Sequence, residues 1–349
     1  MNPDARAAFF RQADWCERLG SPFTSLVCRA LGAHLTEESA FGARLLNWHG
    51  DLAADATALR ACGALNAMAR EGNPSLAPLY PPKPLPSVDE FWRGIRSVIT
   101  DEDARLSSFL DSAPQTNEVA RSAALLPGYL EIARRTGLSL SIREIGASAG
   151  LNLLFDRYSY DYGSFSWSAH AAKVTIPCEW RGATPDLARS ISVADRRGCD
   201  LNPIDAGNSV ARARMLAYIW PDQTARLARA EAALEVASAE GVNIEAIDAG
   251  LFAARELQVG AAKRALVLVH SICWQYLPEV TRAAITAEIA GAAIRATRRS
   301  PFAWLRLEAE SGLPHGAALR LSLWPDGPVD ALIGVADFHG GWFERRDEV

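Results

Sequence analysis

The sequence contains no closely spaced pairs of cysteine or histidine. Its six cysteines are scattered with no C-x-x-C, and its six histidines form neither H-x-x-x-H nor H-E-x-x-H. These absences exclude the common zinc-binding and dithiol redox motifs. A chain of 349 residues with isolated cysteines is typical of a protein whose thiols are reduced and buried. We therefore predict no metal site, and we expect a cytoplasmic protein.

Long apolar runs and an excess of positive charge are also missing. The longest apolar segments, such as residues 265–269, have the length of strands, and residues 1–15 carry charges throughout. No membrane span or signal peptide is therefore predicted. The formal net charge of −5 gives no overall attraction to polyanions. We expect neither a nucleic acid nor a membrane as a partner.

The two halves of the chain differ in composition and periodicity. Residues 1–137 are rich in alanine, leucine and arginine and poor in β-branched residues, which favours helices. From residue 138 short apolar strands alternate with helical segments, and a turn signal at residues 324–327 (WPDG) separates two further strands. Strands that alternate with helices form a parallel α/β sheet. We predict an all-helical domain over 1–137 and, over 138–349, a mostly parallel sheet with a terminal antiparallel hairpin.

The segment REIGASAG at residues 143–150 carries the most specific chemical signal. Within it, Gly146-x-Ser148-x-Gly150 matches the G-x-S-x-G turn that presents the nucleophile of a serine hydrolase. Preceded by Glu144, the same residues are one substitution away from the acid-x-G-x-G-x-G loop of S-adenosylmethionine-dependent methyltransferases. Ser148 is therefore either a nucleophile or part of a cofactor loop.

Two alternatives to the cofactor loop fit the sequence less well. A hydrolase elbow normally follows several strands, one of which supplies the oxyanion-hole loop. Here mostly helical residues precede Ser148, although the order Ser148…Asp248…His339 is that of a triad. A nicotinamide dinucleotide loop needs G-x-G-x-x-G, and Ser148 and Leu151 occupy two of those glycine positions. Both alternatives stay open.

The cofactor interpretation accounts for more of the sequence. The loop follows the first predicted strand, residues 138–145, and its small residues let a ligand approach the backbone. Asp200 ends the second predicted strand, where it could bind ribose hydroxyls, and Asp248 ends the third, beside the adenine. A helix that begins at Leu151 would offer its N-terminus to the carboxylate of the ligand. The fourth strand ends at His270, on the substrate side.

Residues 138–349 thus resemble the class I S-adenosylmethionine-dependent methyltransferase fold, which implies a Rossmann-like sheet. The phrases EIGASAGLNLL, RRGCDLNPID, YIWPDQTARLARAEAAL and LSLWPDG resemble an uncharacterised bacterial family, domain of unknown function 2332. Two features depart from the methyltransferase pattern: Ser148 replaces the central glycine, and 50 residues separate Gly150 from Asp200. We interpret the excess, residues 158–181, as an inserted hairpin and a lid beside the site. The cofactor residues that the first resemblance implies are Glu144, Gly146, Ser148, Gly150, Asn152, Asp200, Asp248 and Leu251.

Methyl transfer from a sulfonium is an in-line displacement, for which the protein aligns the reactants and excludes water. An oxygen or nitrogen acceptor also needs a base to take its proton. The candidates for a catalytic base are His270 at the end of the fourth strand, Glu308 and His339.

Several of these residues also have a purely structural interpretation. His270 could be a buried, hydrogen-bonded histidine, and Glu308 could pair with a nearby arginine such as Arg306. Asp200 could shape a turn, and Asp248 could cap the helix that follows it. The sequence alone does not choose between the structural and the chemical roles.

The leading hypothesis is a methyltransferase that uses S-adenosylmethionine and acts on an unidentified small molecule. A serine hydrolase with Ser148 as its nucleophile is one alternative, and a non-catalytic protein that binds a nucleotide or another ligand is the other. The helical half could serve as a lid, as an acceptor-binding domain or as the surface of a homo-oligomer.

Overall fold

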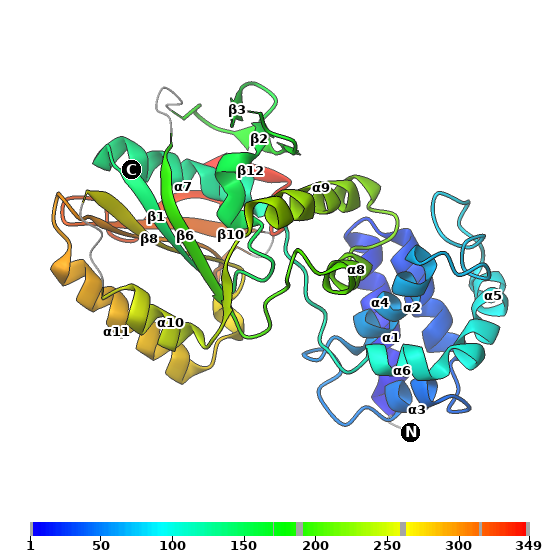
Figure 1. Cartoon of the computed structure of the whole chain (residues 1–349). Coiled ribbons are helices and arrows are strands. Elements are labelled where there is room, and N and C mark those ends of the chain that lie inside the picture. The colour runs from blue at the N-terminus through cyan, green and yellow to red at the C-terminus, as the bar shows by residue number, and fades with distance from the viewer. Residues whose placement is uncertain (1–2, 170, 186–190, 259–262, 314–315, 347–349) are drawn as a thin grey trace. The chain divides into compact units, whose positions relative to one another are not determined.

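The computed structural model describes residues 3–169, 171–185, 191–258, 263–313 and 316–346 (Figure 1). The chain forms two compact units. The helical unit comprises Met1–Thr116 and Asn208–Glu231, and the sheet unit comprises Asn117–Gly207 and Ala232–Val349. No helix among the described residues is both long enough and apolar enough to cross a lipid bilayer.

The helical unit buries one apolar face of each of its longer helices. In α5, for example, Phe91, Ile95 and Val98 recur at helical spacing and are buried. Ser87 and Glu90 begin this helix with a capping box, in which each side chain accepts the backbone N–H of the other residue. The helices of this unit are α1 (Pro3–Arg18), α2 (Pro22–His34), α3 (Ala40–Leu46), α4 (Thr57–Arg70), α5 (Val88–Asp101), α6 (Asp103–Phe109) and α8 (Ser209–Ala217).

The sheet unit is built on a nine-stranded sheet with the order β5-β12-β11-β10-β9-β8-β1-β6-β7. Neighbours from β7 to β9 are parallel, whereas β9, β10, β11 and β12 are successively antiparallel. The predicted hairpin is therefore present, and β5 adds to its outer edge in parallel with β12. The strands are β1 (Ser139–Ile145), β5 (Glu179–Arg181), β6 (Val193–Asp200), β7 (Ile244–Ala246), β8 (Arg264–Ser271), β9 (Phe302–Ala309), β10 (Ala317–Trp324), β11 (Ala331–Ala336) and β12 (Trp342–Arg345).

Helices cover both faces of this sheet (Figure 1). Helices α10 (Ala249–Glu256) and α11 (Glu279–Arg295) pack together on one face, over a core that includes Leu268 and Phe302. Helix α7 (Arg121–Thr136) lies on the other face, against β9 and β10. Strand β8 is consequently buried from Ala265 onward, as expected for a strand covered on both sides. Helix α9 (Thr224–Glu240) connects the two units along the chain.

The two units differ in their bounds from the predicted division at residue 137. Helix α7, predicted as the last helix of the helical domain, is buried along most of its length because the sheet covers it. A Cβ added to Gly128 in this helix would lie 2.3 Å from Leu305 Cδ1 in β9, so the helix approaches the sheet closely. Helix α8 instead belongs to the helical unit, where the Asn66 amide donates to the carbonyls of Ala217 and Ile219 (2.8 and 3.0 Å).

The segment predicted as an inserted hairpin contains a small sheet of β2 (Ser159–Asp161), β3 (Ser166–Ser168) and β4 (Thr175–Pro177). Its alternating tyrosines are buried, and their hydroxyls donate to backbone carbonyls of the same unit. These bonds fasten the insertion to α7 and to the segment after β1, which gives the tyrosines a structural role. The bonds run from Tyr158 to Leu151, from Tyr160 to Phe155 and from Tyr162 to Ala123 (2.9, 2.7 and 2.7 Å).

Candidate functional site

The candidate site lies at the carboxyl edge of the parallel strands. From the central strand β1 the chain proceeds to β6 and β7 on one side, whereas β8 and β9 lie on the other side. The loops after β1 and β8 therefore meet at the point where the strand order reverses, which is where open α/β sheets bind ligands. They are in contact: the Cys273 thiol donates to the Ile145 carbonyl (3.5 Å), and a Cβ added to Gly146 would lie 2.9 Å from Cys273 Cβ.

The loop after β1, residues 146–151, has an unusual backbone. Gly146, Ser148 and Gly150 all adopt positive φ (+67°, +54° and +72°). Glycine does so freely, but a serine in this region carries strain of about 1–3 kcal/mol. The surrounding structure must therefore hold Ser148 in place.

Protein groups already accept most of the loop's backbone N–H groups. The acceptors are a neighbouring strand, a carboxylate, the loop itself and an asparagine side chain. A phosphate cradle needs such N–H groups free and directed at the ligand, so this loop is poorly suited to phosphate. The pairs are Ala147 to the Cys199 carbonyl (2.9 Å), Ser148 to Asp200 Oδ2 (3.0 Å), Gly150 to the Ala147 carbonyl (2.7 Å) and Leu151 to Asn117 Oδ1 (2.8 Å).

The helix predicted from Leu151 to Tyr158 is a short 3-10 helix, η1 (Asn152–Arg157), with non-helical dihedrals at Leu154. The predicted helix is therefore present only as a 3-10 helix, and a ligand carboxylate at its N-terminus stays a prediction. An α-helix bonds each carbonyl to the N–H group four residues further on, whereas here the backbone bonds span three residues and side chains also bind three carbonyls of the segment. Arg196 donates to the Leu153 carbonyl (2.6 Å), and the hydroxyls of Tyr158 and Tyr160 take two others.

Three polar side-chain atoms between residues 144 and 152 are buried without a hydrogen-bond partner among the residues that the structure describes. They are Glu144 Oε2, Ser148 Oγ and Asn152 Oδ1. Their residues are 2%, 4% and 2% exposed. Leaving such an atom unpaired costs about 1–3 kcal/mol, so three together require an explanation. Since all three can accept a hydrogen bond, they suit a ligand that presents donors or a positive charge.

The surroundings of Glu144 favour the neutral form of its carboxyl. Burial raises the pKa of its carboxyl to about 8; the Arg121 guanidinium opposes this rise and the Asp200 carboxylate adds to it. A cation placed beside Glu144 would favour the ionised form. Arg121, which begins α7 and donates to the Phe338 carbonyl (2.9 Å), was not among the residues predicted from the sequence. No sequence motif pointed to Arg121, because α7 was predicted to belong to the helical domain and lies in the sheet unit.

The two acidic residues at the ends of β6 and β7 both hold local turns. Asp200 is partly exposed and accepts the N–H groups of Ser148 and Asn202 (3.0 and 2.9 Å). Asp248 caps α10, as its structural interpretation predicted, and its second oxygen accepts the Thr281 hydroxyl (3.2 Å). Leu251, in the first turn of α10, is 63% exposed. The turns keep both carboxylates at the carboxyl edge without burying them.

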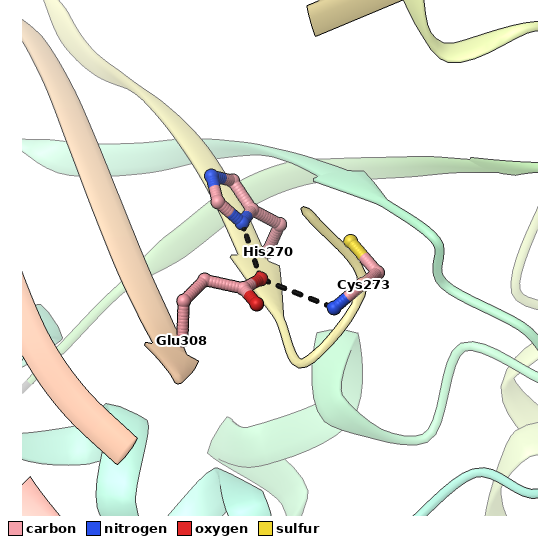
Figure 2. A group of neighbouring side chains, drawn as sticks. All are labelled: His270, Cys273 and Glu308. Carbon is pink, nitrogen blue, oxygen red and sulfur yellow. Dashed lines mark hydrogen bonds and ion pairs between the residues drawn. The ribbon is translucent and has the colours of Figure 1, made fainter. Parts of the chain in front are cut away.

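His270 and Glu308 form the centre of a buried hydrogen-bond network (Figure 2). Glu308 Oε1 lies 2.7 Å from His270 Nδ1 and accepts the backbone N–H groups of Cys273 and Trp274 (3.1 and 3.3 Å). The Trp304 indole donates to His270 Nε2 (3.0 Å). Because an indole only donates, Nε2 is the acceptor and the proton lies on Nδ1, directed at the carboxylate. Both ring nitrogens are thus paired in a fully buried imidazole.

The ligand atoms of His270, Cys273 and Glu308 lie within 4.8 Å of one another, a spacing that a metal ion could bridge. The hydrogen bonds argue against that use. A metal on Nδ1 would put a proton on Nε2, where it would face the Trp304 N–H. Burial also raises the pKa of the Cys273 thiol well above its usual range, which disfavours the thiolate that binds metals. Figure 2 shows that Cys273 directs its backbone nitrogen to the carboxylate.

The three predicted bases lie in different surroundings. His270 is buried and hydrogen-bonded, as its structural interpretation predicted. Glu308 does not form the predicted pair with Arg306, because Asp330 binds that arginine and His270 binds the carboxylate. His339 is exposed in the turn after β11, where its backbone N–H donates to Asp337 (3.0 Å). The structure therefore brings His270 and Glu308 together in one buried network.

Ser148 shares one property with a hydrolase nucleophile and lacks another. Its positive φ is that of a strained strand-to-helix turn. Its hydroxyl, however, is buried and bonds no imidazole among the described residues, whereas a nucleophile elbow exposes the hydroxyl beside a histidine. The geometry gives the hydrolase alternative less support than the cofactor loop.

Gly146→Ala tests the contact between the two loops. We expect it to lower the free energy of unfolding by about 1–2 kcal/mol more than Gly137→Ala. Both glycines have similar positive φ (+67° and +65°), but a Cβ on Gly137 would meet nothing within 4 Å. Urea unfolding of both variants gives the difference. Equal losses would show that Cys273 yields to the added methyl group.

Comparison with known proteins assigns a family. A model of the bacterial family described as "Uncharacterized protein conserved in bacteria (DUF2332)" matches residues 6–345, and the chain belongs to this family. The match includes most of both the helical unit and the sheet unit. No curated protein and no solved structure matches the chain.

Proposed function

We propose that this member of the DUF2332 family binds S-adenosylmethionine at the carboxyl edge of its sheet and transfers the methyl group to a small molecule. The order β7-β6-β1-β8-β9 supports a Rossmann-like assignment, because it is the 3-2-1-4-5 order of doubly wound sheets. The loop with three positive φ values follows the central strand of that order. This is the position at which such sheets bind their ligands.

The cluster of unpaired acceptors carries the proposal. Glu144, Ser148 and Asn152 offer buried oxygens to a ligand with donors or positive charge, and S-adenosylmethionine carries an ammonium and a sulfonium. A dinucleotide would need the loop N–H groups for its phosphates, and the protein already uses most of them. Asp200 would then hold the ribose hydroxyls. Asp248 and Leu251 would border the adenine.

When bound, the cofactor supplies an electrophilic methyl group on sulfur. The protein's own contribution is to orient the acceptor, to exclude water and to take a proton where the acceptor carries one. His270 can act as a base only if the Trp304 indole leaves Nε2. In the arrangement described here, His270 and Glu308 position the turn at Cys273 and Trp274.

Isothermal titration with S-adenosylmethionine and S-adenosylhomocysteine tests binding. We expect dissociation constants in about the 1 μM–1 mM range, and at least a tenfold weakening in Asp200→Asn. Asp205→Asn is the matched control, because Asp205 forms a similar local turn with Gly207 (2.8 Å) and is exposed. No heat from either ligand at millimolar concentration would contradict the proposal.

Transfer of a labelled methyl group to a library of small molecules then separates an enzyme from a protein that only binds the ligand. Binding without transfer to any acceptor would favour the non-catalytic alternative. The positive φ of Ser148 keeps a serine hydrolase as the second candidate function. A fluorophosphonate probe would label the wild type and not Ser148→Ala if that candidate were right.

A further inference from the structure

The helical unit contains a cavity of about 440 Å³ between α4, α6 and α8. This volume is in the range of small-molecule pockets. Its accessible apolar wall is formed by Ala67 of α4 and by Val210 and Ala213 of α8, whereas Ala64, Met68 and Leu106, which also line it, are buried. The cavity belongs to the helical unit alone, so it is separate from the site at the sheet.

Small side chains leave this space open. Ala64 and Ala67 are three residues apart on one face of α4, and Ser209 and Ala213 are four residues apart on one face of α8. Alanine and serine are too short to fill the gap between these helices. Val210, which also lines the cavity, is 76% exposed. Ala213, one turn further along α8, is exposed as well, so these two side chains offer an apolar surface that a ligand can reach.

Three arginines and one glutamate lie around the cavity. Two of the arginines have a carboxylate partner: Arg70 pairs with Glu231 (2.7 Å) and Arg105 with Glu71. Arg214 differs, because no carboxylate pairs with it among the residues that the structure describes. The lining thus carries an excess of positive charge in a protein whose formal net charge is −5.

Arg214 is held in a position that suits an anion. Its guanidinium lies over the Phe109 ring (4.1 Å to the centroid) and donates to the Phe109 carbonyl (2.7 Å). A guanidinium presents five N–H donors in a planar fork that matches a carboxylate. The ring and the carbonyl fix the plane of this fork beside the apolar wall.

We propose that this cavity binds a small amphipathic carboxylate, with its carboxylate on Arg214 and its apolar body against Ala67, Val210 and Ala213. The charge of Arg214 selects the anion, and the apolar wall selects the apolar body. The site goes beyond the proposed methyl transfer and does not depend on it.

The test uses naphthylacetate and its neutral counterpart naphthylacetamide, titrated into the full chain and followed by ligand fluorescence. We expect the wild type to bind the acid at least tenfold more tightly than the amide. Arg214→Met should reduce the affinity for the acid to that for the amide and leave the amide unchanged. Arg212→Met, on the same helix but outside the cavity, should change neither. Ala67→Trp fills the cavity and should abolish binding of both.

Equal affinities of the wild type for acid and amide would overturn the proposal, as would equal losses in Arg214→Met and Arg212→Met. Unchanged binding in Ala67→Trp would place the probe elsewhere and overturn it as well. Circular dichroism melting verifies that each variant folds. If Arg214→Met fails to fold, two measurements still test the proposal: the ratio of the affinities of the wild type for acid and amide, and the loss of binding in Ala67→Trp. Titration of Ala67→Trp with S-adenosylmethionine distinguishes this site from the one at the sheet.

Discussion

Glu308→Leu is expected to lower the free energy of unfolding by about 3–5 kcal/mol. A single oxygen of Glu308 accepts the Nδ1–H of His270 and the backbone N–H groups of Cys273 and Trp274. Leucine offers no acceptor, so three donors in a largely buried site would lose their partner. Urea unfolding followed by tryptophan fluorescence measures the loss, because Trp274 and Trp304 both lie next to the network.

Two further variants identify the cause of that loss. Glu308→Gln keeps one acceptor oxygen and should lose less than half as much stability as Glu308→Leu. Glu245→Leu removes a carboxylate that is 44% exposed and pairs with Arg255 on the surface, so it should change stability by about 1 kcal/mol or less. A loss in Glu308→Leu no larger than that in Glu245→Leu would contradict the network described here.

The second large effect is a dependence of stability on pH that Glu144 causes. Its pKa is about 8 in the folded protein, against an ordinary value of 4.5. Between these two values the folded carboxyl keeps a proton that the unfolded chain has released, so raising the pH destabilises the folded state. The stability that the protonated Glu144 contributes is fully present below pH 4.5. It decreases between pH 4.5 and pH 8 and is absent above about pH 8. We expect it to be on the order of 3–5 kcal/mol.

Glu144→Gln isolates this contribution from those of the other titrating groups. The amide stays neutral at every pH, so the difference in unfolding free energy between the wild type and the variant should change across this window. Glu235→Gln, which removes an exposed carboxylate on α9, serves as the control. A constant difference for Glu144→Gln from pH 5 to pH 9 would show that Glu144 is already ionised in the folded protein.

Much of the sheet could be predicted from local signals. The alternation of apolar strands and helices predicts the parallel sheet, and WPDG predicts the hairpin of β10 and β11. The pairing of β5 with β12 had no such signal, because the two segments are short and lie far apart along the chain. Likewise, the 3-10 geometry of η1 had no local signal, because one of the side chains that bind its carbonyls, Arg196, comes from the distant strand β6.

The residues of the candidate site also fall into those that local sequence signals indicate and those that they do not. Glu144, Asp200 and His270 could be selected because each lies at or near the end of a predicted strand. The choice of partner for Glu308 could not be predicted, since His270 on the neighbouring strand β8 and Arg306 on β9 itself are both within its reach. Asp330, 24 residues further along the chain, decides the outcome by binding Arg306. A contact between two strands thus depends on a residue beyond the next turn.

The helical unit is assembled from two stretches of chain, and this determines the order in which it can form during synthesis. Residues 1–116 leave the ribosome first but lack α8, whose neighbouring carbonyls bind the Asn66 amide. Strands β1 and β6 are made before α8 emerges. The N-terminal unit therefore cannot be finished before the next unit has begun. A fragment truncated at residue 116 would contain an incomplete bundle.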